Sequence, residues 1–382
     1  MAVFALGGNG MAKSWARSRA GLGGVLFALG TAIAVMAPAG QSAVAAARTG
    51  APSVIGILTT AGVADAKEGS LMAGWTRQYP KAAQIVVASD ATNGPVIVVL
   101  TTTGVVYAKE GSLTAGWTRE YPKAAQIAVA SDATNGPVVV VLTTTGVVYA
   151  KEGSLTAGWT KEYTGVAKIA VASDATNGPL IAVLTTAGAV YVKEGSLNAP
   201  WTKEYTGAAQ MAVASDPAHG PLIAVLTTAG VVYVKEGSLN APWTKEYTGA
   251  AQMAVASDSA SGLLIAVLTT GGVAYAKESG LNAPWTKEYT KTAKIAVASD
   301  ATNGPLIAVL TTAGVMYAKE GSLTAGWTKE YTGAAQMAVA SDPVTGALIG
   351  MLSAGVAYAK QGGLSTPWTN ESFGVTQVAV AG

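Results

Sequence analysis

The sequence predicts an all-β fold assembled from repeats, and two observations support this prediction. A tryptophan recurs at a spacing of 42 residues six times and then of 41 residues. Each interval is a near copy of the last, with short apolar runs and turn residues about every 8–12 positions, as is typical of β-strands. Self-similarity at this period indicates a repeat architecture, in which one unit cannot bury its apolar face without neighbours. The recurring tryptophans are Trp75, Trp117, Trp159, Trp201, Trp243, Trp285, Trp327 and Trp368.

One copy, residues 168–207, divides into four predicted strands. The segment SDATNG separates the first two, and its Asn-Gly pair adopts positive φ readily, which favours a hairpin. Gly188, Gly195 and Gly207 mark the ends of the later strands. We label the strands A to D in chain order, and they cover 169–172, 180–186, 190–193 and 201–205.

The burial expected from the side chains falls from strand A to strand D. In strand B, Leu180, Ala182 and Leu184 alternate with other apolar residues, so both faces must be covered. Strands C and D carry the charges of each copy. This gradient fits sheets arranged radially and packed face to face, with strand A innermost and strand D at the rim. A membrane barrel would need longer strands with one polar face, and a β-helix would use shorter rungs without Asn-Gly hairpins. A β-propeller is therefore predicted.

The order of the strands also predicts how the ring closes. The chain starts on a B strand at about Val54 and ends on an A strand at 377–381. We expect eight four-stranded blades of about 42 residues, in which the C-terminal strand completes the first blade and removes the exposed edges. Asp65 and Ser372 replace tyrosines of the other copies at this seam. Terminal repeats commonly differ in this way, so we expect these two residues to serve seam packing.

The N-terminal residues differ in kind from the repeats. Basic residues precede the apolar run 21–36, and small residues follow it. This layout is typical of a secretory signal peptide, with cleavage near Ala45 or Ala47. The alternative is an uncleaved membrane anchor. We expect a secreted, extracellular protein whose mature form does not span a membrane. The expected boundaries are 1–47 for the signal peptide, 48–53 for a short linker and 54–382 for a single propeller domain.

The composition excludes several classes of function. There is no cysteine, so disulfides and thiolate chemistry are excluded. Charged residues are 12% of the chain, about half of the roughly 25% usual for soluble domains. The 24 Lys and Arg nearly balance the 22 Asp and Glu, and the signs are interleaved within each copy. Without a basic stripe to follow phosphates, a nucleic acid partner is not expected.

Catalytic and metal-binding groups are sparse. His219 is the single histidine, it lies in an A–B turn, and no partner for a general base is evident. The aspartates that end strand A, such as Asp174, offer one carboxylate per loop, well short of the roughly 6–8 oxygen ligands of Ca²⁺. An Asx-turn role is favoured for them. We therefore expect no enzyme, no catalytic residues, no metal and no cofactor. A glycosidase or lyase is the less favoured alternative.

The repeat resembles the tectonin-type propeller lectins, a group that includes tachylectin-2-like and bacterial fucose-binding propellers. The matching segments are IAVASD, the apolar strand ending in Thr-Thr-Ala-Gly, Val-Tyr-x-Lys, and Trp-Thr-Lys-Glu-Tyr-Thr-Gly, and the likeness covers about 54–381. The resemblance implies sugar binding in pockets between adjacent blades or at blade rims, with aromatic and polar side chains as ligands.

The candidate carbohydrate-binding residues are the recurring tryptophans and the glutamates that end strand C. Each tryptophan either packs between blades or stacks on the apolar face of a sugar. Each glutamate either belongs to a solvated Lys-Glu pair or binds a ligand. We expect both to emerge on the rim that carries the A–B turns, opposite the Thr-Thr-Ala-Gly turns. The glutamates are Glu110, Glu152, Glu194, Glu236, Glu278 and Glu320.

These features predict a secreted, non-catalytic, multivalent carbohydrate-binding propeller whose partners are glycans or glycoconjugates. Near-identical copies supply the same groups everywhere, which favours repeated weak binding, and linked sites can gain roughly 10²–10⁴ in avidity. The alternative is a structural or protein-interaction propeller that binds a surface protein.

Overall fold

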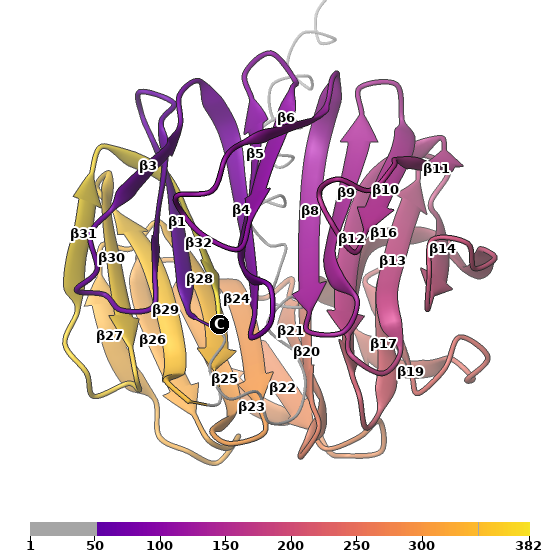
Figure 1. Ribbon diagram of the computed structural model, residues 1–382. Helices are drawn as coiled ribbons and strands as arrows, with labels where there is room; N and C mark the ends of the chain where they lie inside the picture. Colours follow the sequence, from indigo (N-terminus) through magenta and orange to yellow (C-terminus); the bar gives the residue numbers. More distant parts are fainter. Residues whose placement is uncertain (1–51, 343) are drawn as a thin grey trace, which may run out of the picture. The chain divides into compact units, whose positions relative to one another are not determined.

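The computed structural model describes residues 52–342 and 344–382. The predicted signal peptide and residues 48–51 of the predicted linker lie outside the described residues. Within them, 32 strands form eight four-stranded antiparallel sheets, which are the blades of a β-propeller (Figure 1). The predicted fold class and number of blades are confirmed.

The first four blades each run from an inner strand A to an outer strand D. Blade 1 contains β32 (Val375–Ala381), β1 (Val54–Thr59), β2 (Ala64–Glu68) and β3 (Thr76–Tyr79). Blade 2 contains β4 (Ala82–Asp90), β5 (Gly94–Thr101), β6 (Val106–Glu110) and β7 (Thr118–Tyr121). Blade 3 contains β8 (Ala124–Asp132), β9 (Gly136–Thr143), β10 (Val147–Glu152) and β11 (Thr160–Thr164). Blade 4 contains β12 (Val166–Asp174), β13 (Gly178–Thr185), β14 (Ala189–Glu194) and β15 (Thr202–Thr206).

The remaining four blades follow the same order. Blade 5 contains β16 (Ala208–Asp216), β17 (Gly220–Thr227), β18 (Val231–Glu236) and β19 (Thr244–Thr248). Blade 6 contains β20 (Ala250–Asp258), β21 (Gly262–Thr269), β22 (Ala274–Glu278) and β23 (Thr286–Tyr289). Blade 7 contains β24 (Thr292–Asp300), β25 (Gly304–Thr311), β26 (Val315–Glu320) and β27 (Thr328–Thr332). Blade 8 contains β28 (Gln336–Asp342), β29 (Gly346–Ser353), β30 (Val356–Gln361) and β31 (Thr369–Phe373).

The ring closes through the strand at the C-terminal end, as predicted. β32 pairs antiparallel with β1, with Val54 opposite Ala381 and Leu58 opposite Gln377. Gln377 also reaches blade 2, where its side-chain amide donates to the backbone oxygen of Ile85 at 2.8 Å. The first blade is therefore built from both ends of the propeller and is tied to its neighbour (Figure 1).

The hydrophobic core is divided among the interfaces between neighbouring blades, which we call joints and number by their two blades. Leu180, Ala182 and Leu184 of β13 pack against blade 5 in joint 4–5. Ile181 and Val183 of the same strand pack against blade 3 in joint 3–4. All five side chains are buried, so strand B is covered on both faces, as its sequence predicts. Each blade therefore depends on two neighbours for its burial.

Two of the charged residues of strands C and D are buried, against the prediction that they lie in solvent: the strand-C lysine and the strand-D glutamate, such as Lys193 and Glu204, whereas Lys203 of strand D is exposed. Lys193 of β14 is buried, and its Nζ lies 2.5 Å from Oε2 of Glu162 in β11 of the preceding blade. The same Nζ donates to the backbone oxygen of Leu197 at 2.6 Å. The prediction of a solvated Lys-Glu pair within strand C is therefore wrong, because the lysine side chain points into the joint and pairs with a glutamate of the preceding blade.

A bulge in strand D explains how the glutamate reaches the joint. In blade 3, Val148 pairs with Tyr163 and Tyr149 pairs with Lys161, so Glu162 is left without a partner. Such a bulge redirects a side chain out of the regular alternation. Glu162 thereby points into joint 3–4 and meets the lysine of the next blade.

The buried pair recurs at seven joints of the described residues. The pairs are Lys67–Glu371, Lys151–Glu120, Lys193–Glu162, Lys235–Glu204, Lys277–Glu246, Lys319–Glu288 and Lys360–Glu330. In joint 1–2, Gln78 stands where the other blades have glutamate, and burial lowers the pKa of Lys109. This joint therefore holds a buried lysine that faces a neutral amide.

The aspartates that end strand A join the blades near their inner ends. Oδ1 of Asp174 accepts hydrogen bonds from the backbone nitrogens of Thr176 and Asn177, both at 2.8 Å. This is the predicted Asx turn, which is confirmed. Oδ2 of the same aspartate accepts a hydrogen bond from Oγ of Ser215 in the next blade at 2.5 Å. The aspartate therefore also links two blades, a role that the sequence did not predict.

We predict that Lys193→Met strongly destabilises the propeller. The substitution leaves the carboxylate of Glu162 buried without a cation, which costs about 3–5 kcal/mol for a buried pair. Chemical denaturation would measure the free energy of unfolding.

Two matched variants test the cause of this loss. In Lys193→Met/Glu162→Leu no charge remains unpaired, so most of the lost stability should return. Lys109→Met should cost less than Lys193→Met, because Gln78 leaves no carboxylate behind. Equal losses for the two single lysine variants would contradict the explanation.

Candidate functional site

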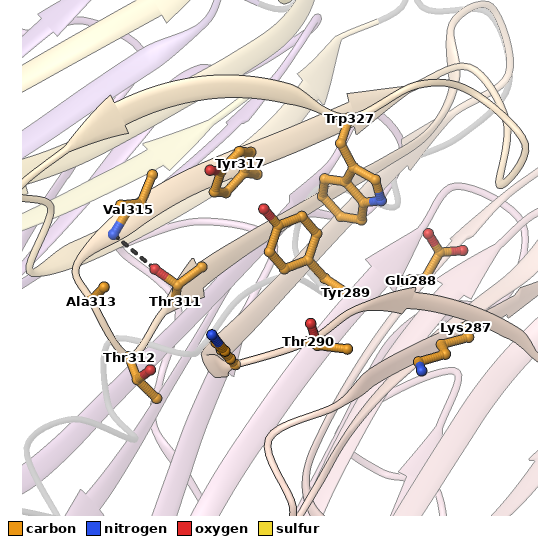
Figure 2. Close-up of a pocket in the computed structure, with 11 residues that line it drawn as sticks. Lys287, Glu288, Tyr289, Thr290, Thr311, Thr312, Ala313, Val315, Tyr317 and Trp327 are labelled. Carbon is orange, nitrogen blue, oxygen red and sulfur yellow. Dashed lines mark hydrogen bonds between the residues drawn. The ribbon is translucent and has the colours of Figure 1, made fainter.

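An aromatic cluster lies at the outer part of joint 6–7. Tyr289 of β23 stacks on Tyr317 of β26, with ring centroids 4.7 Å apart. Trp327, which precedes β27, meets Tyr289 edge to face at 5.2 Å. Figure 2 shows the ring of Tyr289 between those of the other two residues. Two strands of blade 7 and one of blade 6 thus form one aromatic surface.

The same three-residue cluster recurs at seven joints. Its members are Tyr79–Tyr107–Trp117, Tyr121–Tyr149–Trp159, Tyr163–Tyr191–Trp201, Tyr205–Tyr233–Trp243, Tyr247–Tyr275–Trp285, Tyr289–Tyr317–Trp327 and Tyr331–Tyr358–Trp368. At joint 8–1, Ser372 and Asp65 take the places of the two tyrosines. The seam therefore lacks the tyrosine pair, although Trp75 keeps its position there.

The aromatic cluster of joint 6–7 borders an open cleft of about 550 Å³. Thr311 and Thr312 come from the B–C turn of blade 7, and Thr290 and Lys291 come from the loop between β23 and β24. The tyrosines and threonines bring hydroxyl groups to the cleft around an aromatic wall (Figure 2). Such a mixture of apolar surface and a few polar groups is typical of small-ligand sites.

The hydroxyl of Tyr289 in the cleft stays protonated over the physiological range. Burial, together with the hydrogen bond to the hydroxyl of Tyr317, raises the pKa of Tyr289 to about 12. Burial raises the pKa of Tyr121 and Tyr163 to about 12 in the same way. A protonated phenol both donates and accepts hydrogen bonds, so Tyr289 gives the cleft of joint 6–7 a neutral group suited to hydroxyl-bearing ligands.

All eight predicted tryptophans lie at joints and are half-buried. The strand-C lysine of the same blade covers one face of each indole ring, with Nζ 4.8–5.3 Å from the ring centroid. The indole nitrogen of Trp117 donates to the backbone oxygen of Gln78 in the preceding blade at 2.8 Å, and Trp243 makes the same contact to Glu204 at 2.9 Å. The tryptophans thus hold the joints together, and Trp327 also lines the cleft.

The six predicted glutamates are half-buried. Each is the last residue of strand C, whereas the cleft of joint 6–7 lies beside the first residue of that strand. Oε2 of Glu110 accepts a hydrogen bond from the backbone nitrogen of Leu155 in the next blade at 3.0 Å. Glu320 ends β26, whereas Val315 begins it and lines the cleft. The structure therefore brings Trp327 to the cleft of joint 6–7 and does not bring Glu320 there.

His219 lies in the A–B turn of blade 5, with its Nδ1 3.1 Å from Oδ1 of Asp216 and its side chain 38% exposed. It occupies the place that Asn177 has in blade 4, where the amide contacts the turn aspartate at 3.1–3.2 Å. In residues 52–342 and 344–382, no group of three or more His, Asp or Glu side chains is arranged to hold a metal ion.

Sequence reasoning missed the tyrosine pair. The signal was present, because each regular copy has one tyrosine in strand C and one in strand D. Their meeting could not be read from one copy, since Tyr289 and Tyr317 belong to different blades.

The comparisons with known proteins identify a fold and no family. No protein-family model and no curated protein matches the chain. The BP39L lectin from Burkholderia pseudomallei is similar over 77% of this chain and 99% of its own, with 13% identity and a TM-score of 0.56. The dihydro-heme d1 dehydrogenase NirN is similar over 85% of this chain and 74% of its own, with 11% identity and a TM-score of 0.59. AztD from Citrobacter koseri is similar over 87% and 98%, with 8% identity and a TM-score of 0.50.

At these identities the likeness shows the fold alone, and proteins with different activities share it. The chain is an eight-bladed β-propeller protein with a three-ring aromatic cluster at seven of the joints in residues 52–342 and 344–382, and with a cleft beside the cluster of joint 6–7. Its resemblance to the tectonin-type group in particular stays a prediction. In the described part of the chain, no helix has the length and apolar character needed to cross a membrane.

We predict that Glu194→Gln stabilises the protein at pH 8 and has a smaller effect near pH 4. Burial raises the pKa of Glu194 above its ordinary 4.5, and the carboxylate of Asp174 adds to the rise. The folded protein then binds this proton more tightly than the unfolded chain, so stability is lost as pH rises through the folded pKa. Thermal unfolding at several pH values measures the difference.

The exposed Asn198→Gln substitution in the adjacent loop serves as the control, because it adds no titrating group. A Glu194→Gln variant whose stability relative to wild type stays constant with pH would contradict the assignment.

Proposed function

We propose that this protein is a secreted, non-catalytic propeller that binds carbohydrates at several equivalent sites. The observation that carries the proposal is the aromatic cleft of joint 6–7, whose three-ring cluster recurs at six further joints. Six glutamates were expected to share the binding sites, but the proposed sites do not use them.

The chemistry of the cleft suits a saccharide. One face of a sugar ring carries C–H groups that pack on aromatic rings, while its edge carries hydroxyls. In joint 6–7 the exposed parts of Tyr289 and Tyr317 supply the aromatic surface. Thr312 and the tyrosine hydroxyls supply donors and acceptors on the same wall. A ligand that offers both kinds of surface satisfies both parts of the cleft.

The repetition of the cleft supports multivalent binding. The same three aromatic types occur at each of the seven joints, so each site should bind the same kind of ligand weakly. Linked weak sites gain roughly 10²–10⁴ in avidity on a clustered surface. Catalysis instead depends on one site with groups in different environments, and the same three-ring cluster repeats at these seven joints. A lectin is among the solved propellers that share this fold.

A glycan array of the mature protein, followed by calorimetry with the strongest ligand, tests the proposal. Tyr163→Ala/Tyr289→Ala should weaken binding at the two altered joints by about 3–10-fold, because an aromatic contact contributes roughly 0.5–1.5 kcal/mol. Glu152→Gln/Glu278→Gln is the matched control, since these glutamates belong to the set first predicted as ligands and lie at the far end of strand C.

Two results would overturn the proposal. One is the absence of binding to any glycan at millimolar concentration. The other is capture of a surface protein that persists in excess free sugar, which would favour a protein-interaction propeller. If Tyr163→Ala/Tyr289→Ala binds as the wild type does and Glu152→Gln/Glu278→Gln loses binding, the binding site lies near the A–B turns instead of at the aromatic clusters.

Secretion is proposed from the sequence alone. The exported protein should begin at Ala46 or Arg48, as cleavage after Ala45 or Ala47 requires. N-terminal sequencing of protein recovered from the medium measures this. Recovery from the membrane fraction with residues 1–47 intact would instead support the anchor alternative.

A further inference from the structure

The loop that leads from strand D of one blade to strand A of the next varies in charge at one position. Three of these D–A loops carry lysine there: Lys81, Lys123 and Lys291. The other five carry glycine: Gly165, Gly207, Gly249, Gly333 and Gly374. This is a change of charge at a position where the rest of the repeat is nearly constant.

The lysines adopt a backbone conformation that glycine would adopt more readily. Lys81, Lys123 and Lys291 have φ of 60°, 61° and 57°, whereas Gly207 has φ of 87° at the same place. Left-handed φ is unfavourable for a residue with a side chain and free of that penalty for glycine. The folding of the loop therefore does not explain the lysines.

Two backbone hydrogen bonds of the loop are the same in lysine and glycine loops, although Gly207, Gly249 and Gly333 also donate their own nitrogens to the preceding B–C turn. The backbone oxygen of Lys291 accepts a hydrogen bond from the nitrogen of Thr312 at 2.8 Å, and that of Gly165 accepts one from Thr186 at 2.9 Å. The residue after Lys291 donates to the backbone oxygen of Gly272 in the preceding blade at 2.9 Å. The backbone at Lys291 is thus held in place between two blades by these hydrogen bonds.

This fixed point lies at the cleft. Lys291 lines the cleft of joint 6–7 together with Lys287 of β23. The carboxylate of Glu288, which also lines it, is paired with Lys319 at 2.7 Å. Among residues 52–342 and 344–382, neither Lys287 nor Lys291 forms an ion pair with a carboxylate. The cleft therefore carries an uncompensated positive charge beside its aromatic wall.

Joint 1–2 also has a surplus of positive charge, to which both its D–A loop lysine and its strand-C lysine contribute. Lys81 lies in its D–A loop, and Gln78 replaces the strand-D glutamate, so no carboxylate of the described part of the chain pairs with the buried Lys109. The tyrosine pair of this joint, Tyr79 and Tyr107, is intact, with centroids 4.5 Å apart.

We propose that the three joints with lysine in the D–A loop bind saccharides that carry an anionic group, a carboxylate or a sulfate. The four other joints with a tyrosine pair take neutral saccharides. This inference rests on the proposed function and adds the class of ligand. The ring then displays two kinds of site, which differ by one charged side chain on a common aromatic wall.

Calorimetry at low ionic strength tests the proposal, because salt screens exposed charges. The probes are a hexamer of galacturonic acid, its fully methyl-esterified form, and dextran sulfate beside unmodified dextran. The wild type should bind at least one anionic probe about fivefold more tightly than its neutral counterpart, as expected for one or two exposed charge contacts. A preference for galacturonic acid over its methyl ester shows that the sites recognise a carboxylate. A preference for dextran sulfate over dextran shows that they recognise a sulfate.

Two matched variants isolate the lysines. Lys81→Gly/Lys123→Gly/Lys291→Gly should lose this preference and keep its affinity for the neutral probes within about twofold. Glycine is the residue of the other joints, so folding should be unimpaired, and an unchanged melting temperature verifies it. Adding Gly207→Lys to this variant should restore part of the preference. A Cβ at Gly207 meets no atom within 4 Å, but its φ of 87° strains a side chain, so the loop has to shift toward the φ of 57–61° of the three lysines.

The outcomes separate this inference from the proposed function. Equal affinity for charged and neutral probes, or a preference that survives the triple lysine variant, would overturn the inference and leave the carbohydrate-binding proposal standing. Failure of all four probes and of every glycan on the array would overturn both.

Discussion

The structure depends on the contact between a strand-C lysine and the blade that precedes it. Lys193 lies within 2.5 Å of Glu162, donates to Leu197 and sits 5.0 Å from the ring centroid of Trp201. Taking two charges out of water is costly, and it is tolerated only where good geometry and further hydrogen bonds compensate. Because the pair spans the joint, these conditions are met only when two blades take one relative position. That position also sets where the tryptophan and the tyrosine pair meet.

The candidate sites follow from the same constraint. The bulge that turns the strand-D glutamate into the joint also precedes the tyrosine that faces the cleft, as Glu162 precedes Tyr163. The backbone of this bulge therefore positions both the glutamate and the tyrosine. The D–A loop position is different. The backbone oxygens of Lys291 and Gly207 both accept a hydrogen bond from the B–C turn of the next blade, although the nitrogen of Gly207 makes an additional bond to Gly188. The charge of a site can thus vary there while the packing between blades is preserved.

The joints beside the seam depart from the repeat in separate ways. Joint 8–1 keeps the buried pair, Lys67 with Glu371, but replaces the tyrosine pair with Asp65 and Ser372. Joint 1–2 keeps the tyrosine pair but replaces the glutamate with Gln78. Packing of the blades and construction of the cleft are therefore separable at the level of single residues, although both use the same strands.

The sequence by itself determined the number of blades, the order of their strands and the closure of the ring. The number of blades follows from the period of the repeat, and the closure of the ring follows from the strand types at the two ends of the repeat array. The order of the strands follows from patterns within one copy, the apolar alternation of Leu180 to Leu184 and turn chemistry such as that of Asp174. Only the tertiary structure decided that Lys193 is buried with Glu162 and that Tyr289 stacks on Tyr317. The partners in each contact belong to different sheets, and their meeting depends on a bulge that no local pattern marks. From a single copy, a charged residue is expected to lie in solvent. It can be buried here because the neighbouring blade provides the compensating charge.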